Sequence, residues 1–255
     1  ALYSRWVRRE EDAWDAAAFL GAHCDRARVM PFLEGIPCSI HAIVLPDGVS
    51  VFRPVEILTL RSGDSGRFLY AGVATFWDPS SQDREEMRTV ARKVGAGLRR
   101  SVGFRGALTV DGILTADGFL PTELNSRLGA GLIVMCRGHG DIPITLLNLA
   151  VIEGEALGFQ ADELERHVLA IADNHRQGAA WTIASGISAT DQARPVVFRD
   201  RECYLATRDE PYDGVLSFAS SNIGGLVRLS LRSDRTAAGS AIGPLVAAAF
   251  GLADR

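Results

Sequence analysis

The sequence predicts an α+β protein in which helices pack on an antiparallel sheet. Runs of β-branched and aromatic residues alternate with turns that contain Gly and Pro, for example at residues 46–48 and 62–66. Amphipathic segments lie between these runs, and in the longest of them Met87, Val90 and Val94 recur near helical spacing. With 255 residues and 47% hydrophobic content, the chain can bury one large core or two smaller ones.

Each element follows from a local pattern of this kind. The first helix, 10–20, opens with acidic residues that suit the positive end of the helix dipole. Further helices are expected at 83–100, 144–152, 161–175 and 240–252, with 144–152 buried. A short strand at 29–30 is expected to precede strands at 38–45, 49–60 and 67–77, and shorter strands follow at 181–188, 196–198, 202–206, 215–219 and 227–231.

Polar residues gather in a predicted hairpin at 103–127. A three-residue loop at 116–118, with its Gly in a left-handed conformation, sets Asp111 directly opposite Glu123. In the same register Asn125 lies on the same face, because side chains alternate along a strand. A two-residue loop would place the two acids on different faces of the hairpin.

Oxygen ligands on one face predict a site for a hard cation. Two carboxylates and one amide oxygen suit Mg²⁺, which takes oxygen ligands and keeps waters or phosphate oxygens. Arg127 lies on the same face if the strand continues, and its guanidinium fork can grip a phosphate or a developing acyl phosphate. The alternative is an ordinary hairpin with solvated acids, since Glu-x-Asn alone is a common pattern.

An acid on one strand followed by Glu-x-Asn-x-Arg on the next resembles the metal-binding hairpin of the ATP-grasp superfamily. Gly-x-x-Gly before the acid is similar to its biotin carboxylase and carbamoyl phosphate synthetase branch. The resemblance implies that Asp111, Glu123 and Asn125 hold Mg²⁺, or Mn²⁺ in its place, between ATP phosphates. It implies that Arg127 contacts the reacting group. The fold it implies is an ATP-grasp C-terminal lobe followed by a small C-terminal α+β subdomain.

Residues 28–44 resemble the ATP-grasp hinge and the strand after it. The resemblance implies that this hinge binds the adenine edge of ATP, here with Met30, Phe32 and Leu33. The acid that holds the ribose in many members is absent after the hinge glycine. Glu34 is the substitute candidate, and its alternative is a loop carboxylate before a turn glycine.

Three further residues are candidates for substrate contact. His41 alternates with Ser39 on one strand face, and it is either a substrate or phosphate ligand or a half-buried structural histidine. Arg137 and His139 closely follow the metal hairpin, where family members contact the acceptor substrate.

Only one of the 27 basic residues is a lysine, Lys93, and it lies on a charged helix face. ATP-grasp members usually carry two lysines upstream of the hinge that reach the ATP phosphates. We therefore expect an upstream portion with those lysines and a glycine-rich loop, in cis or as a second chain. Residues 1–155 would then form a partial ATP-grasp domain, and residues 156–255 a C-terminal α+β subdomain. We also allow for a homodimer of this chain.

Composition excludes several other classes. A net charge of −4 without a basic block argues against a nucleic-acid binder. The longest apolar runs, 129–136 and 241–252, are too short or too rich in small residues to span a bilayer. The four cysteines lack Cys-x-x-Cys spacing, so we expect reduced thiols in a cytoplasmic protein.

The function expected from the resemblance is an ATP-dependent carboxylate–amine ligase. It would activate a small-molecule carboxylate as an acyl phosphate, transfer it to an amine, and release ADP and phosphate. A biotin-carboxylase-like enzyme is an alternative, but that branch has a catalytic Glu four residues after the Arg, where Gly131 stands here. A non-catalytic ATP-grasp binding or assembly module is the other alternative.

Overall fold

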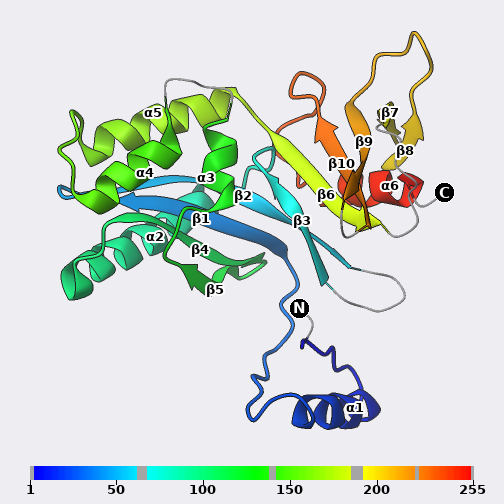
Figure 1. The fold of residues 1–255 in the computed structure, drawn as a ribbon, viewed down its shortest axis with the longest axis horizontal. Helices are drawn as coiled ribbons and strands as arrows, with labels where there is room; N and C mark the ends of the chain where they lie inside the picture. Colours follow the sequence, from blue (N-terminus) through cyan, green and yellow to red (C-terminus); the bar gives the residue numbers. More distant parts are fainter. Residues whose placement is uncertain (1–2, 62–67, 138–141, 185–191, 222–223, 254–255) are drawn as a thin grey trace.

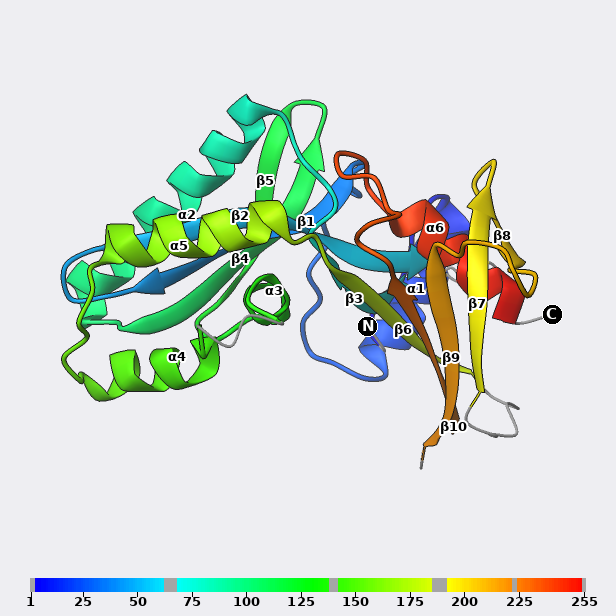
Figure 2. The ribbon, with the colours of Figure 1, turned by 90° about the horizontal axis from the view of Figure 1, so that it is seen from above.

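The computed structural model describes residues 3–61, 68–137, 142–184, 192–221 and 224–253. Its centre is one sheet with the strand order β5-β4-β1-β2-β3-β6-β10-β9-β7-β8, and each neighbouring pair is antiparallel (Figure 1, Figure 2). The strands are β1 Ile36–Val44, β2 Val49–Arg61, β3 Phe68–Ala74, β4 Gly106–Thr115, β5 Gly118–Asn125, β6 Gly178–Ala184, β7 Gln192–Arg199, β8 Glu202–Leu205, β9 Gly214–Ser221 and β10 Gly224–Leu231.

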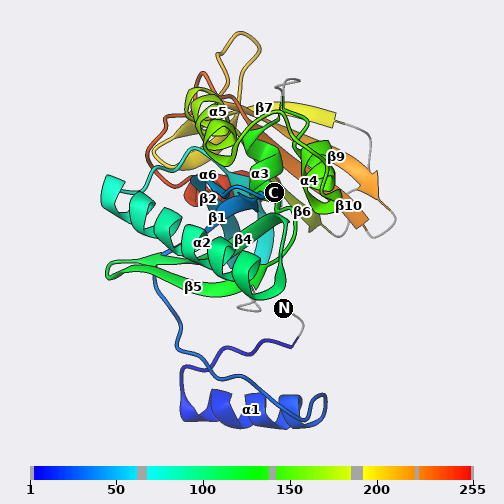
Figure 3. The ribbon, with the colours of Figure 1, turned by 90° about the vertical axis from the view of Figure 1, so that its left-hand side faces the viewer.

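The helices cover this sheet in layers. α2 packs on one face of β1, β2 and β4, and α3 and α4 pack on the opposite face. α5 runs along β2, and α6 packs on β2, β8 and β10. α1 stands apart from the body at the end of an extended segment (Figure 3). Their bounds are α1 Glu10–Gly21, α2 Ser81–Val102, α3 Ala130–Met135, α4 Ile144–Glu153, α5 Ala161–Asn174 and α6 Gly243–Ala253.

α2 shows how local sequence signals start and end a helix. The Ser80 hydroxyl caps it by accepting the backbone N–H of Asp83 at 3.1 Å. Gly103 ends it with φ +64, a left-handed conformation that a side chain disfavours. Its buried residues Met87 and Ala91 pack against β1 and β4 in one apolar cluster. This packing fixes which face of β1 and β4 remains for polar side chains.

The first half of β2 is an edge that side chains from two helices cover. Only the second half of the strand, from Glu56 onward, pairs with β3. Glu165 on α5 accepts the backbone N–H of Val51 at 2.7 Å, and Arg88 on α2 donates to the Val51 carbonyl at 3.0 Å. An exposed row of backbone groups invites pairing with another chain, and these two side chains satisfy it internally.

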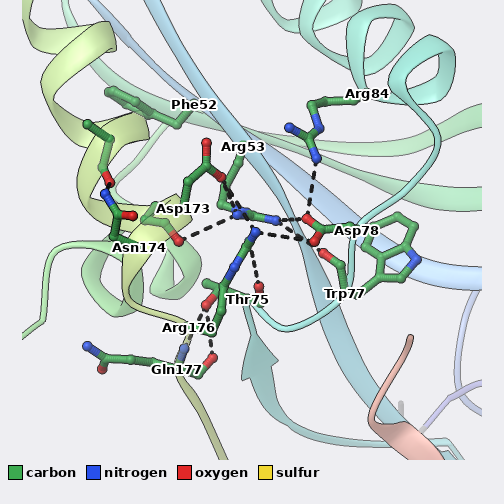
Figure 4. A network of polar contacts seen from close by, with 12 residues as sticks. Phe52, Arg53, Thr75, Trp77, Asp78, Arg84, Asp173, Asn174, Arg176 and Gln177 are labelled. Atoms are coloured by element: carbon green, nitrogen blue, oxygen red, sulfur yellow. Dashed lines mark hydrogen bonds and ion pairs between the residues drawn. The ribbon is translucent and has the colours of Figure 1, made fainter. Parts of the chain in front are cut away.

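A network of arginines and aspartates, here called the arginine cluster, joins β2, α5 and the segment before α2 (Figure 4). Arg53 is fully buried and forms ion pairs with Asp78 and Asp173. Arg84 and Arg176 also pair with Asp78, at 3.3 and 3.2 Å. The cluster thus surrounds a buried charge with opposite charges, which is the condition under which a buried ion is tolerated.

A buried acid joins the two halves of the sheet. Glu56 on β2 is 4% exposed, and its carboxylate accepts the backbone N–H groups of Ile242 and Gly243 at 2.8 and 2.9 Å. These groups begin α6, so Glu56 caps a helix 186 residues away in sequence. Burial raises the pKa of Glu56, and the two hydrogen bonds lower it in part.

Most of the elements expected from the sequence are confirmed, with boundaries that differ by a few residues. The strand expected at 29–30 is wrong, because this segment has no ladder partner and lies in irregular backbone. The helix at 144–152 is exposed on one face, with Leu146 66% exposed, so its expected burial holds for the other face only. α3 was not expected.

The division at residue 155 stays a prediction. β6, which follows residue 155, pairs with β3, which precedes it. α5 also follows residue 155 and packs on β2. Within the described residues, no helix is long and apolar enough to cross a bilayer. Cys24 is an exposed free thiol, and the other three cysteines are buried free thiols.

Candidate metal and acyl-phosphate site

The hairpin of β4 and β5 carries the candidate metal ligands in the expected pairing. Asp111 lies opposite Glu123, and Asn125 lies opposite Thr109. The expected three-residue loop is wrong: Thr115 pairs with Gly118, which leaves a two-residue loop.

A β-bulge at Thr122 reconciles this loop with the pairing. Asp111 pairs with Glu123 while the next residue, Gly112, pairs with Pro121, so Thr122 is the extra residue. Its hydroxyl donates to the Asp111 carbonyl at 3.3 Å. The bulge moves the rest of β5 by one position and returns both acids to one face. We name Asp111, Glu123 and Asn125 the metal face.

The metal face brings like charges together at a half-buried position. Burial raises the pKa of Asp111, and the neighbouring Glu123 carboxylate raises it further; Arg127 and a hydrogen bond from Asn125 lower it in part. The Asn125 amide donates to Asp111 Oδ2 at 2.9 Å, and this use of the N–H group leaves the amide oxygen for another partner.

These residues fit a Mg²⁺ ion as an open, oxygen-only site. Two carboxylates and one amide oxygen supply part of an octahedral shell, and waters or phosphate oxygens would supply the rest. In the part of the chain that is described, no three His, Cys, Asp or Glu side chains gather as a metal site. The donor set therefore differs from that of a zinc site, which is usually tetrahedral and rich in His and Cys.

His41 lies beside the metal face, on the same face of the sheet, in the middle of β1. It is 2% exposed, and its ring nitrogens lie 3.1 Å from the Ser39 hydroxyl and 2.9 Å from the Thr109 hydroxyl. Burial lowers the pKa of His41 to about 3, so the ring is neutral at pH 7. Ser39 and Thr109 are the cross-strand neighbours of Asp111 and His41, respectively, so this chain of hydrogen bonds borders the metal face on β1 and β4.

Two glycines let the segment after β5 pack flat on His41. A Cβ at Gly129 would lie 2.6 Å from His41 Cε1, and a Cβ at Gly131 would lie 2.7 Å from Val55 Cγ2 and in contact with His41 Nε2. Real Cβ atoms do not approach other atoms so closely, so any larger residue would push this segment away. The packing fixes the start of α3 and, with it, the segment that carries Arg127.

Arg127 is exposed and follows β5 at the edge of the metal face. Its charge acts on Asp111 and also on Tyr70, which lies on β3. Tyr70 was not expected at this site, because β3 and the hairpin lie on opposite sides of β1 and β2 in the sheet order. Burial raises the pKa of Tyr70, the Asp111 charge raises it further, and Arg127 lowers it in part.

The expected nucleotide hinge is an extended segment that leads into β1. Two aromatic rings contact Phe32: its ring centroid lies 4.3 Å from that of Trp6 and 5.8 Å from that of Phe68 on β3. Met30 is 53% exposed, Leu33 is partly buried and Glu34 is exposed. The contact between Phe32 and Phe68 ties the hinge to β3.

The two expected acceptor contacts follow α3. Arg137 is exposed, and its carbonyl accepts a hydrogen bond from the Gln177 side chain at 2.7 Å. This bond links the end of α3 to the start of β6. His139 lies outside the described residues.

No family profile and no curated protein matches this sequence. Solved structures do match its fold. An L-amino acid ligase from Bacillus licheniformis aligns with a TM-score of 0.53 and 13% identity, over 98% of this chain and 60% of that one. Carboxyaminoimidazole ribonucleotide synthase from Aspergillus clavatus, in complex with ATP, aligns with a TM-score of 0.51 and 16% identity, over 97% of this chain and 57% of that one.

These similarities show that the chain has the ATP-grasp fold. The chain spans about three fifths of the length of these relatives. At identities of this level the likeness concerns the fold, and the chemistry has to be argued from the residues of this chain.

Proposed function

We propose that this chain, which has the ATP-grasp fold, acts in an ATP- and Mg²⁺-dependent carboxylate–amine ligase. In this reaction a carboxylate attacks the γ-phosphoryl group of ATP to give an acyl phosphate and ADP. An amine then displaces phosphate to form the C–N bond. The observation that carries the proposal is the metal face, with the charge of Arg127 acting on it.

The residues of the chain divide this work between them. Asp111, Glu123 and Asn125 would hold Mg²⁺, which when bound neutralises charge on the phosphate oxygens during transfer. Arg127 would grip the carboxylate and the acyl phosphate through two parallel N–H groups. Because phosphoryl transfer depends on positioning and charge, the chain needs no covalent nucleophile of its own.

The hinge supports a nucleotide site at one side of this centre. Backbone groups of residues 30–34 would bind the adenine, with Phe32 serving as the anchor through its contacts with Trp6 and Phe68. Lys93 is exposed on α2, which packs on the face of β1 and β4 opposite the metal face. We therefore propose that the lysines for the ATP phosphates come from an upstream portion, in cis or as a second chain.

The packing of Gly131 argues against a biotin-carboxylase-like reaction. That branch has a catalytic Glu at this position, but here the His41 ring and Val55 occupy the space that a side chain would need. The complete set of Asp111, Glu123, Asn125 and Arg127 argues against a non-catalytic module. Neither carboxylate forms an ion pair within the described residues that would give it a structural reason.

Product analysis of the full-length protein tests this function. Incubation with Mg²⁺, ATP and pools of amino acids should give ADP and phosphate, and hydroxylamine should trap a hydroxamate of the activated carboxylate. Arg127→Ala should lower kcat by at least about 100-fold with little effect on the KM for ATP. Arg127→Lys should rescue little, since an ammonium lacks the two-pronged geometry. Formation of AMP and pyrophosphate would refute the mechanism.

A further inference from the structure

The segment 125–129, here called the Arg127 bend, joins β5 to α3 and is anchored at both ends. Asn125 ends β5 and pairs with Thr109 on β4. Gly129 precedes α3 and is buried, and the first atom that a Cβ on it would meet is Thr109 Oγ1. Leu128 packs against the apolar cluster between the sheet and the helices α3, α4 and α5. Arg127 is therefore an exposed residue on a short segment whose two ends both lie on Thr109.

Thr109 belongs to a buried row of polar side chains on β1 and β4. Its hydroxyl lies 2.9 Å from His41 Nδ1, and His41 Nε2 lies 3.1 Å from the Ser39 hydroxyl. A neutral imidazole has one N–H donor and one acceptor nitrogen, so both ring nitrogens have a partner within this row. Because a buried polar group without a partner is costly, the row holds the Thr109 hydroxyl in one position.

We propose that Thr109, supported by His41, is a positioning residue for Arg127. The Thr109 hydroxyl sets how closely Gly129 approaches the sheet, and the same residue pairs with Asn125, so Thr109 determines where Arg127 stands relative to the metal face. Thr109 is 4% exposed and does not itself reach a substrate. A misplacement of about 1 Å can cost a reaction about 100-fold in rate. The proposal rests on the proposed function, because that function gives Arg127 its contact with the reacting group.

Thr109→Val and Thr109→Ser test the role of the hydroxyl in the full-length protein. Valine keeps the branched shape, removes the hydrogen bond to His41 and sets a methyl group against Gly129. With Mg²⁺, ATP and a carboxylate and amine pair that supports turnover, Thr109→Val should lower kcat for ADP formation at least about tenfold. The KM for ATP should change less than about twofold, because the proposed nucleotide contacts lie on the hinge. Thr109→Ser keeps the hydroxyl and should retain kcat within about threefold.

Gly129→Ala displaces the Arg127 bend from the opposite side, and it replaces Thr109→Val if that variant does not fold. Gly129 has φ −90, which alanine adopts without strain, so the effect comes from contact of the new methyl group with Thr109 and His41. The variant should reproduce the loss of kcat. Gly97→Ala on α2 is the matched control, because a Cβ there meets no atom within 4 Å. Val227→Ala, in the apolar core around β10, is a control for lost stability, and neither control should alter kcat.

A double-mutant cycle decides whether Thr109 acts through Arg127. In the Arg127→Ala background, Thr109→Val should lower kcat less than about twofold, because no guanidinium remains to be misplaced. The same fold loss of kcat in both backgrounds would overturn the proposal.

Trypsin cleavage after Arg127 measures the anchoring without turnover. Arg127 is exposed, but Leu128 is packed on the core, so cleavage requires local opening of the Arg127 bend. The reference is cleavage after Arg26, which is exposed in irregular backbone. Relative to that reference, Thr109→Val should speed cleavage after Arg127 at least about fivefold, and Thr109→Ser should speed it much less. An unchanged ratio would overturn the proposal.

The two measurements together distinguish this proposal from the ligase function. If the cleavage ratio rises as expected but no carboxylate and amine pair yields ADP, the ligase function fails and the anchoring by Thr109 stands. If ADP forms and Thr109→Val leaves kcat unchanged, the positioning role fails and the ligase function stands.

Discussion

The arginine cluster and the metal face both place carboxylates on the sheet, but the charged partners of these carboxylates differ between the two regions. In the arginine cluster, Asp78 and Asp173 are both paired with guanidinium groups, and Arg53 is fully buried between them. In the metal face, Asp111 and Glu123 lie directly opposite each other, and the pKa of Asp111 is raised. Like charges opposite each other on a sheet destabilise it.

This difference indicates that the arginine cluster supports the fold and that the metal face is available to a ligand. A buried charge is tolerated when its partners are in place, and removal of one partner is destabilising. A pair of acids that is only partly compensated destabilises the fold while both are ionised, and a bound cation would relieve that cost. We therefore expect changes in the metal face to affect turnover and changes in the arginine cluster to affect stability.

The largest expected effect is on turnover, in Glu123→Gln. The amide keeps the shape of the side chain but removes the charge that would hold Mg²⁺, so ADP formation at saturating ATP should fall about 1,000-fold or more. The free energy of unfolding in urea should change by less than about 1 kcal/mol, because Glu123 is exposed. Asp117→Asn, at the exposed tip of the same hairpin, is the control. Normal ADP formation in the Glu123 variant would remove the metal assignment.

The next largest effect is on stability, in Arg53→Met. The variant removes the buried member of the network, while Asp78 keeps Arg84 and Arg176 and Asp173 is partly exposed, so the free energy of unfolding should fall by about 1–3 kcal/mol. Arg84→Met removes a more exposed partner of Asp78 and should cost less than about 1 kcal/mol. Urea unfolding at pH 7 measures both. Equal losses in the two variants would contradict the distinction between buried and exposed members of the cluster.

A smaller effect concerns the pH dependence that His41 imposes. Its pKa is about 3 in the folded state and 6.5 in the reference state, so the unfolded chain takes up a proton first as pH falls. Stability from the neutral ring is therefore complete above about pH 6.5 and is lost as pH falls toward 3.

His41→Gln tests this dependence. The loss of stability between pH 7 and pH 5 should become smaller than in the wild-type protein, even if repacking costs about 1–2 kcal/mol at pH 7. His167→Gln, an exposed change on α5, should leave the slope unaltered. An unchanged slope in the His41 variant would show that the ring accepts a proton in the folded state.

The smallest expected effect is on the thermal stability of an Asp111 variant, with and without Mg²⁺. Its folded-state pKa is raised, so it favours folding at low pH, and that contribution is lost as pH rises through the folded-state value. Without Mg²⁺ at pH 7, Asp111→Asn should leave thermal stability unchanged or raise it by less than about 1 kcal/mol. Added Mg²⁺ should raise the Tm of the wild-type protein more than that of the variant. Equal Mg²⁺ shifts would argue against Asp111 as a ligand.

Local patterns sufficed for most of the elements and for the order of the candidate ligands, but they missed α3 and wrongly predicted a strand at 29–30. Alternation along β4 and β5 put Asp111, Glu123 and Asn125 on one face, and helical spacing together with Ser80 and Gly103 set the length of α2. The pairing was right although the expected loop was wrong, because the bulge at Thr122 compensates for the shorter loop. No local pattern marks that bulge.

The sequence by itself determined the α+β class, the hairpin and the order of its candidate ligands, because these depend on residues within about 25 positions of one another. Only the tertiary structure decided that His41 is buried beside the metal face, that the rings of Tyr70 and Trp181 meet, and that Glu56 caps α6. These contacts join residues 68 to 186 positions apart. They depend on the order of strands in the sheet, and periodicity within one strand carries no information on that order.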